Sequence, residues 1–141
     1  MNEANKKDNV REEIEHANES MRAADLLFKN GFTRDAVARL YYSLLYTVRA
    51  MLLTKELEPK SHEGALRLFG LHFVKQEIFE PEDSHIFSRL MKYRQEADYN
   101  PSYLFTPEDF IEFRKEEEIL IQKITSRLKR DLCTTWRKKS I

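Results

Sequence analysis

The sequence predicts an all-α protein, an up-and-down antiparallel bundle of about five helices. Its 141 residues include 3 glycines and 4 prolines but 34% charged residues, a composition typical of long helices joined by short connections. Apolar residues recur three and four positions apart along five segments, and no segment alternates as a half-buried strand would. We expect one helical domain at residues 1–132 and a basic C-terminal tail at residues 133–141.

The first two helices are predicted from their apolar faces and from the residues that flank them. Residues 10–29 carry an apolar stripe, with Asp8 as the expected N-cap and Gly31 as a stop, because glycine tolerates the left-handed conformation that ends many helices. Residues 34–55 follow, with Thr33 as the expected N-cap. This second helix is the most hydrophobic of the five, and we expect it to lie at the centre of the core.

The third helix is predicted at residues 62–76, with Ser61 as its N-cap. Gly64 and Gly70 each cost about 1 kcal/mol of helix propensity relative to alanine. We therefore expect a kink or a break in this segment. Three apolar residues still share one of its faces: Leu66, Phe69 and Phe73.

The last two helices open with clear start signals. Residues 81–98 begin with Pro81 and two acidic residues, which suit the unbonded amides and the positive dipole end of a helix N-terminus. The fifth helix opens in the same way, with Thr106 as the N-cap and Pro107 after it. Its basic C-terminal residues are either a solvated helix end or a surface for RNA or an acidic partner.

Composition and charge exclude several classes of protein. The formal net charge is zero, and the whole molecule is therefore not a general binder of polyanions. The one cysteine, Cys133, rules out an intramolecular disulfide, and the four histidines lack the spacing of a metal site. We expect no metal and no cofactor. Since no apolar run resembles a signal peptide or a membrane span, we expect a cytoplasmic protein that does not bind a membrane.

The main candidate site is the end of the fourth helix. Arg94 and Asp98 share a helix face that is otherwise apolar. An arginine on such a seam needs a partner, and Asp98 can provide one as a structural ion pair that completes the helix. The alternative is that Arg94 binds phosphate, because its planar fork matches phosphate oxygens, with Tyr99 and Tyr103 stacking on a base. The spacing alone leaves both interpretations open.

Two further positions carry weaker signals. His62, which follows the cap Ser61, would serve acid–base chemistry only if folding brings a partner close. Tyr42 points about 100° away from the apolar face of the second helix. It is either a core tyrosine whose hydroxyl has a partner, or part of a surface that packs against a second subunit or another protein.

Three fragments, in their order and spacing, resemble the HEPN domain family, in particular its short stand-alone prokaryotic members. They are "ARLYYSLLYTVRAML" at residues 38–52, the Ser61–His62 turn and "RQEADY" at residues 94–99, and the resemblance covers about residues 10–128. It implies a helical bundle that forms a homodimer and whose partner is a minimal nucleotidyltransferase, often in a toxin–antitoxin pair. In ribonuclease-type members, an arginine and a histidine four to six residues later cleave RNA without a metal.

The chain departs from that ribonuclease pattern. Arg94 matches the arginine, but the nearest position for the histidine holds Tyr99, and no histidine follows within the allowed window. An unperturbed tyrosine has a pKa near 10 and is a poor general base at pH 7. Proton transfer would need a strongly shifted Tyr99, Asp98 as the base, or His62 brought in by folding.

The resemblance thus implies a HEPN-like partner of a minimal nucleotidyltransferase that binds nucleotide or RNA phosphate through Arg94. The alternatives are a metal-independent ribonuclease toxin with a variant motif, and a purely structural protein-interaction module. Whether the chain is an enzyme stays open. The implied site residues are, for catalysis, Arg94, Asp98 and Tyr99; for phosphate binding, Arg94, His62 and Ser61; and for modification by the partner, Tyr99 and Tyr103.

Overall fold

The computed structural model describes the backbone of residues 2–140 and the side chains of residues 2–131. It confirms the all-α bundle, and the described residues contain no strand. A short stretch of π-helix, η1, continues the third helix. The elements are α1 (Glu3–Lys29), α2 (Thr33–Leu53), α3 (His62–Phe69), η1 (Gly70–Val74), α4 (Pro81–Tyr99) and α5 (Pro107–Ser140).

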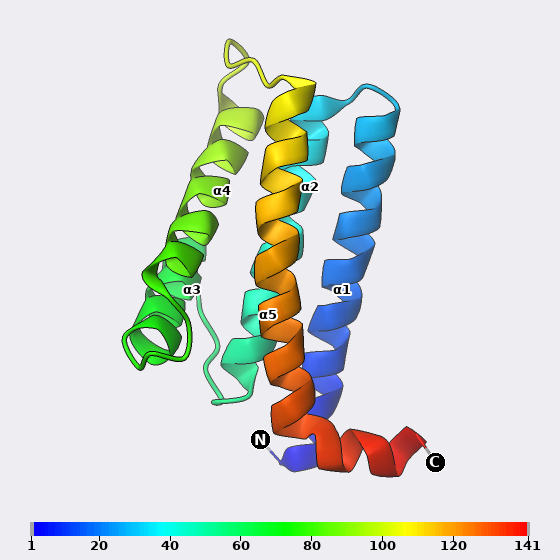
Figure 1. Cartoon of the computed structure of the whole chain (residues 1–141), viewed down its shortest axis with the longest axis vertical. Coiled ribbons are helices and arrows are strands. Elements are labelled where there is room, and N and C mark those ends of the chain that lie inside the picture. Colours follow the sequence, from blue (N-terminus) through cyan, green and yellow to red (C-terminus); the bar gives the residue numbers. More distant parts are fainter. Residues whose placement is uncertain (1, 141) are drawn as a thin grey trace.

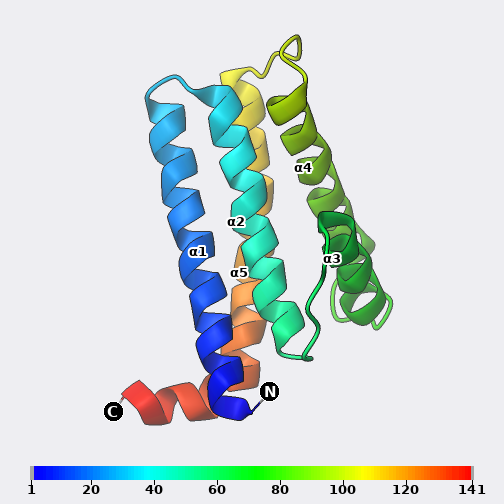
Figure 2. The same cartoon turned by 180° about the vertical axis from the view of Figure 1, so that it is seen from behind.

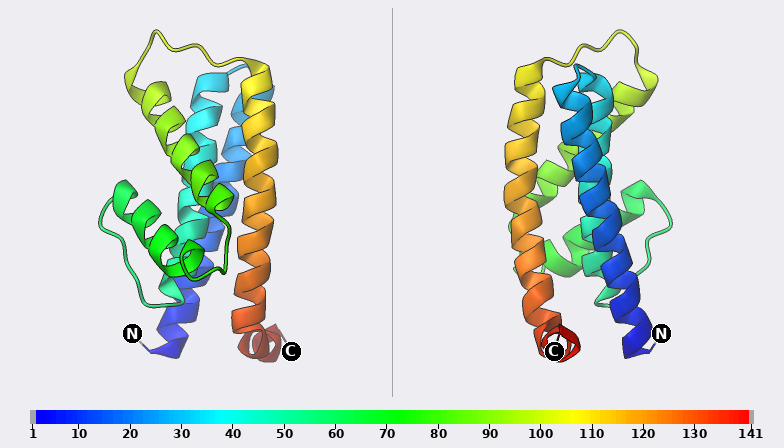
Figure 3. Two further views of the ribbon diagram at one scale, coloured as in Figure 1. Left: turned by 60° about the vertical axis from the view of Figure 1, so that its left-hand side comes forward. Right: turned by 90° about the vertical axis from the view of Figure 1, so that its right-hand side faces the viewer.

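The long helices α1, α2, α4 and α5 run up and down along the long axis of the molecule (Figure 1). Seen from behind, α2 stands in front of α5, between α1 on one side and α3 and α4 on the other (Figure 2). The short helix α3 is inclined to the axis and lies beside α4 (Figure 3). This arrangement leaves one side of α2 facing outward between α1 and α3.

α2 is the centre of the core, as its hydrophobicity predicts. Between residues 36 and 53, all but four of its residues are buried. Because apolar side chains of α3, η1, α4 and α5 pack against it, the burial of this one helix orients the elements around it. The largest fully buried side chains include Tyr41, Phe69, Phe73, Phe87, Leu120 and Ile124.

One carboxyl group is also buried in this core. Glu117 on α5 has an exposed fraction of 0%, and neither of its oxygens has a hydrogen-bond partner among the described residues. The nearby hydroxyl of Ser43 already donates its proton to the Ala17 carbonyl over 2.9 Å. Burial raises the pKa of Glu117 well above its ordinary value and therefore favours the neutral carboxyl.

The start of α1 corrects the prediction. The helix begins at Glu3, well before residue 10, and its N-cap is Asn2, whose side chain accepts a hydrogen bond from the Asn5 amide over 2.8 Å. Asp8, the predicted cap, lies inside the helix. Residues 3–9 are almost all polar, and the periodicity of apolar residues therefore cannot reveal them.

Three other predicted end signals are confirmed. Gly31 follows α1 with a φ of 88°, in the left-handed region that favours glycine. Ser61 caps α3, since its Oγ accepts a hydrogen bond from the Gly64 amide over 2.9 Å. Thr106 caps α5 by accepting from the amide three residues later over 3.1 Å.

Smaller differences concern α2, α3 and α4. Thr33 was expected to cap α2, but it is the first helical residue, and Phe32 before it makes no side-chain cap bond. α2 ends at Leu53, two residues before the predicted end at residue 55. The expected break in the third helix falls at Gly70, where the hydrogen-bond pattern changes to that of η1. α4 ends at Tyr99, one residue after its predicted end.

The C-terminal tail was predicted at residues 133–141. α5 runs as a helix to Ser140, and the side chains of that segment, including Cys133, lie outside the described residues. Among the helices that the structure describes, none is both long and apolar enough to cross a membrane.

Candidate functional site

Three helices meet around Arg94. α4 carries Arg94 on its inner face, with Asp98 one turn later. The N-terminus of α3 brings His62 to the same place, and α2 brings Tyr41. Arg94 is only 8% exposed, and the cation therefore lies almost wholly inside the protein. Such a position is costly unless polar partners surround the guanidinium.

His62 is the nearest polar partner of Arg94. Its Nδ1 lies 3.0 Å from Nη2 of Arg94. A guanidinium can only donate hydrogen bonds, and Nδ1 must therefore accept, which leaves the proton of the neutral imidazole on Nε2. Burial lowers the pKa of His62, and the charge of Arg94 lowers it further. The geometry and the charge thus both favour a neutral histidine that holds the arginine in place.

Asp98 is a more distant partner than the sequence suggests. Its Oδ2 lies 3.5 Å from Nη1 of Arg94, and its side chain is 35% exposed. A charge-assisted hydrogen bond between such groups is usually about 2.7–2.9 Å long. The carboxylate is therefore a loose ion partner at the rim of the site, and the positive charge of Arg94 is only partly neutralised.

Two tyrosine rings flank the guanidinium. The Arg94 guanidinium carbon lies 5.4 Å from the centre of the Tyr41 ring and 5.9 Å from the centre of the Tyr99 ring. Both contacts are cation–π interactions. Tyr41 is fully buried and burial raises its pKa above the ordinary value, whereas Tyr99 is 76% exposed. Tyr41 therefore supports the cation from within, and Tyr99 covers it from the solvent side.

Unpaired polar atoms remain beneath the site. Nε of Arg94 and the hydroxyl of Tyr41 are buried, and neither has a hydrogen-bond partner among the described residues. Buried polar atoms without partners are uncommon in proteins and often mark a place where water or a ligand binds. The site therefore has hydrogen-bonding capacity that the protein itself does not use.

The other predicted site residues are placed differently. Ser61 is next to His62 in sequence, but its hydroxyl oxygen is engaged in capping α3. Tyr103 lies in the loop after α4, where its ring packs 4.7 Å from that of Phe105 and 6.4 Å from that of Tyr93. No contact joins Tyr103 to Arg94 in the described part of the chain. Folding thus brings Arg94, His62, Asp98 and Tyr99 together, but not Tyr103.

Arg34 is a positioning residue that the sequence analysis missed. Its guanidinium donates to the backbone carbonyls of Glu96, Ala97 and Asn100 over 3.0–3.2 Å, and also to those of Pro101 and Tyr103. These carbonyls belong to the last turn of α4 and to the loop behind it. A cation suits this negative dipole end of a helix, and the contacts hold the turn that carries Asp98 and Tyr99.

The geometry supports anion binding more directly than proton transfer. The one basic nitrogen of neutral His62 is occupied by Arg94, and a proton placed there would lie against the guanidinium. Tyr99 is exposed, and Asp98 is at the rim. A phosphate could instead replace the loose Asp98 contact and bind to the guanidinium.

Comparison with known proteins gives consistent matches. The family model of the HEPN domain matches residues 10–128 of the chain. A protein of Methanocaldococcus jannaschii named "Putative toxin" is 39% identical over 124 residues, which are 85% of this chain and 92% of that protein. A second protein of that organism with the same description is 40% identical over 111 residues, 78% of this chain and 70% of its own length. A Thermotoga maritima protein named "UPF0332 protein" is 37% identical over 117 residues, 81% of this chain and 89% of its own.

Proposed function

Because the chain belongs to the HEPN domain family, we propose that it is the HEPN member of a toxin–antitoxin-type pair and binds RNA or nucleotide phosphate through Arg94. The names of the two Methanocaldococcus relatives support the toxin assignment. The positive charge of Arg94 is only partly neutralised, and this supports the phosphate assignment. The nearest polar partner of Arg94 is the neutral His62, and its ionic partner, Asp98, lies 3.5 Å away at the rim of the site. A purely structural ion pair would be expected to show a shorter, better-enclosed contact.

The test of phosphate binding is a comparison of Arg94→Gln with Arg89→Gln. Both arginines lie on α4, but Arg89 is half exposed and pairs with Glu82 and Glu116 on the surface. RNA binding is measured in EDTA with a mixed RNA pool that includes tRNA. We expect Arg94→Gln to lose binding while Arg89→Gln retains it, with circular dichroism showing that both are folded. Equal binding by the two variants would refute the role of Arg94.

The proposed partner is a minimal nucleotidyltransferase. The test is to co-express this chain with a nucleotidyltransferase encoded by a gene next to its own. The two proteins should co-purify. Tyr99 is the better acceptor if that partner modifies a tyrosine, because its ring is 76% exposed whereas Tyr103 is packed among aromatic rings. Mass spectrometry after co-expression should place the added mass on Tyr99. An added mass on Tyr103 alone would contradict this choice.

We further propose that the chain acts as a homodimer, as the family resemblance implies. Light scattering during size-exclusion chromatography measures this directly. A mass of twice that of the 16.9 kDa chain is expected, and a monomer at working concentration would refute it.

A metal-independent ribonuclease is the second candidate function. It is favoured by one observation, the 3.0 Å contact between Arg94 and His62, which supplies the histidine that the local motif lacks. A phosphate that draws Arg94 toward itself would release Nδ1 of His62 to accept a proton from a ribose hydroxyl. In this case both Arg94→Gln and His62→Gln lose RNA cleavage in EDTA. RNA that stays intact with the wild-type protein, while still being bound, would leave phosphate binding as the function.

A further inference from the structure

The outward side of α2 carries four residues of only two kinds. These are the residues between positions 36 and 53 that are not buried, and they follow one line along the helix at spacings of three, four and three. We call them the α2 stripe: Arg39, Tyr42, Tyr46 and Arg49. Tyr46 contacts His16 of α1 and Tyr42 contacts His62 of α3, and the stripe therefore lies on the side of α2 between α1 and α3, which flank α2 in Figure 2. From Arg39 to Arg49 the stripe spans about 15 Å of helix axis.

Tyr42 is the residue of the α2 stripe that contacts the Arg94 site, because its ring packs against His62. The Tyr42 ring lies 6.2 Å from the ring of His62, nearly perpendicular to it, and the Arg39 guanidinium carbon lies 4.8 Å from the centre of the Tyr42 ring. His62 in turn contacts Arg94. Tyr42 is thus a half-buried aromatic ring placed between an exposed cation and the phosphate-binding site. The ring of Tyr46, by contrast, is 5.4 Å from that of His16 on α1.

A cavity of about 230 Å³ adjoins the stripe at its Arg49 end. Leu45, Arg49, Pro59, Lys60, Ser61 and His62 line it, and none of them is acidic. Lys60 is exposed, and its ammonium group has no ion pair or hydrogen bond with another residue that the structure describes. Among residues 2–131 no carboxylate lines the cavity, and Lys60 gives it an unpaired cation beside His62, whereas the second cation, Arg49, pairs with Glu13 outside the lining.

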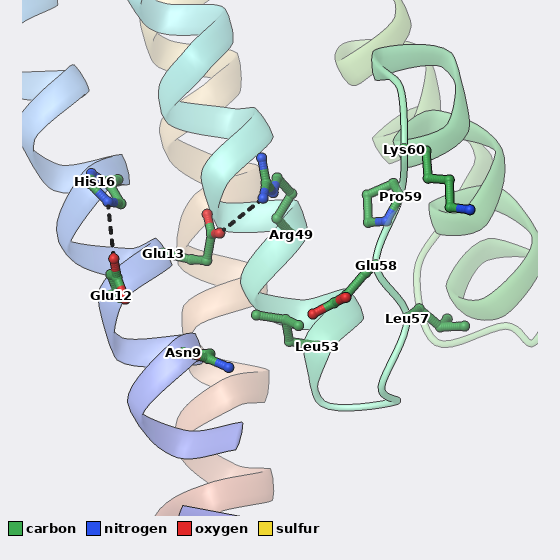
Figure 4. Close-up of a pocket in the computed structure, with 10 residues that line it drawn as sticks. All are labelled: Asn9, Glu12, Glu13, His16, Arg49, Leu53, Leu57, Glu58, Pro59 and Lys60. Carbon is green, nitrogen blue, oxygen red and sulfur yellow. Dashed lines mark ion pairs between the residues drawn. The ribbon is translucent and has the colours of Figure 1, made fainter. Parts of the chain in front are cut away.

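The adjacent, larger pocket has the opposite character. It shares Arg49, Pro59 and Lys60 with the smaller cavity, but its lining also includes three glutamates, Glu12, Glu13 and Glu58 (Figure 4). Nη2 of Arg49 pairs with Glu13 over 3.3 Å, which marks the boundary between the two. A polyanion is repelled on the acidic side of Arg49 and attracted on the His62 side.

We propose that Tyr42, Arg49 and Lys60 form a subsite for single-stranded RNA next to Arg94. This inference rests on the proposed function, since it names the further contacts of the RNA whose phosphate Arg94 binds. The ring of Tyr42 stacks on a base, and Arg49 and Lys60 bind a neighbouring backbone phosphate in the small cavity. Aromatic rings combined with cations are the usual composition of surfaces that bind single strands without reading their sequence.

The charge of the stripe favours RNA over a second copy of the chain. In a twofold symmetric contact, the same surface patch meets itself. Two α2 stripes would then bring the two copies of Arg39 and of Arg49 together, and like charges across an interface are unfavourable. A polyanion instead has the charge that complements the arginines at both ends of the stripe.

The test measures the fluorescence anisotropy of a short labelled oligouridylate over a series of salt concentrations in EDTA, with a gel to show that the RNA stays intact. The variants are Tyr42→Leu, Tyr42→Phe and Lys60→Gln, with Arg94→Gln measured beside them. The matched control is Lys115→Gln, which changes an exposed lysine on α5, the helix that lies behind α2 in Figure 2. Circular dichroism and light scattering record the fold and the oligomeric state of each variant.

We expect Tyr42→Leu to weaken binding at least about fivefold, while Tyr42→Phe, which keeps the ring, binds like the wild type. Lys60→Gln should reduce the slope of log K against log salt by about 0.7, the value of one phosphate contact on a single strand. Lys115→Gln should leave both the affinity and the slope unchanged.

Three outcomes would overturn the subsite. If only Arg94→Gln loses binding while Tyr42→Leu and Lys60→Gln bind like the wild type, the proposed function stands and the subsite is wrong. If the wild-type protein binds neither oligouridylate nor the mixed RNA pool, both proposals fail. If Tyr42→Leu changes the oligomeric state but not the RNA affinity, the stripe is instead a contact between copies of the chain.

Discussion

Arg94 on α4 and His62 at the start of α3 are joined by a 3.0 Å contact although they lie 32 positions apart in the sequence. The contact requires that Nδ1 of His62 be unprotonated, because the guanidinium has no acceptor to offer. Ser61 caps the start of α3 and so fixes the position of His62, while the packing of α4 against α2 fixes the position of Arg94. The contact between the two residues depends on both. The pair therefore links the protonation of His62 to the stability of the fold and, under the proposed function, to phosphate binding.

The first prediction concerns acid sensitivity. Burial and Arg94 lower the pKa of His62 below its ordinary value of 6.5, and the folded state thus binds fewer protons than the unfolded state in the range just below pH 6.5. By linkage, stability rises with pH across that range and is lost on acidification. Urea unfolding from pH 5 to pH 8 should show a weaker pH dependence for His62→Gln than for the wild type. His85→Gln, which changes an exposed histidine on α4, should behave like the wild type.

The second prediction concerns Asp98. Its contact with Arg94 is long and partly exposed, and Asp98→Asn should cost no more than about 1 kcal/mol of unfolding free energy. Under the proposed function the Asp98 carboxylate competes with RNA phosphate for the guanidinium, and the RNA affinity of Asp98→Asn should rise by a factor of up to about five. Urea unfolding and anisotropy measure the two effects. A loss of about 3 kcal/mol or more, without a gain in affinity, would favour the purely structural ion pair.

The third prediction concerns Glu117. Its raised pKa means that the folded state binds more protons than the unfolded state above the ordinary value of 4.5, and stability therefore falls as pH rises from there toward the raised pKa. Relative to Glu117→Gln, the wild type should lose about 1.4 kcal/mol for each unit by which the pKa is raised. Urea unfolding at pH 5 and pH 8 measures this difference. Glu118→Gln, which changes the exposed neighbour, should keep the wild-type pH dependence.

The fourth prediction concerns Arg34. Arg34→Ala removes the charged donor from five backbone carbonyls at the end of α4, and it should cost about 2 kcal/mol of unfolding free energy. Hydrogen exchange should increase at residues 100–105. Arg39→Ala changes an exposed arginine nearby on α2 and should cost no more than about 0.5 kcal/mol. Equal effects of the two substitutions would mean that Arg34 does not hold the loop.

Much of the fold could be predicted because local signals and apolar periodicity agree. Ser61 and Thr106 act as caps where their positions predict, and α3 gives way to η1 at Gly70, one of the two glycines in the segment where a kink or break is expected. The start of α1 could not be predicted in the same way, because residues 3–9 are polar and a helix that needs little burial leaves no apolar pattern. Local capping by Asn2 determines it instead.

The candidate site could be predicted only where its residues share one helix. Arg94 and Asp98 are four residues apart on α4, and their contact follows from helix geometry. The contacts of Arg94 with His62 and of Arg34 with the end of α4 depend on how the helices pack, and no spacing along the chain encodes them. Glu117 escaped notice for a related reason, since it is the middle one of three consecutive glutamates and only the packing of α5 shows which of them is buried.

The contacts of Arg34 also determine when the Arg94 site can form while the ribosome synthesises the chain. Arg34 and the Tyr103 carbonyl are separated by 69 positions, so that the growing chain must have left the ribosome beyond residue 103 before this set of contacts is complete. Contacts between such distant positions must first offset the entropy of closing a long loop and tend to form late. A nascent chain that already exposes Arg94 therefore still lacks the loop that fixes Asp98 and Tyr99. The proposed phosphate-binding site thus becomes ordered only when most of the polypeptide has been translated.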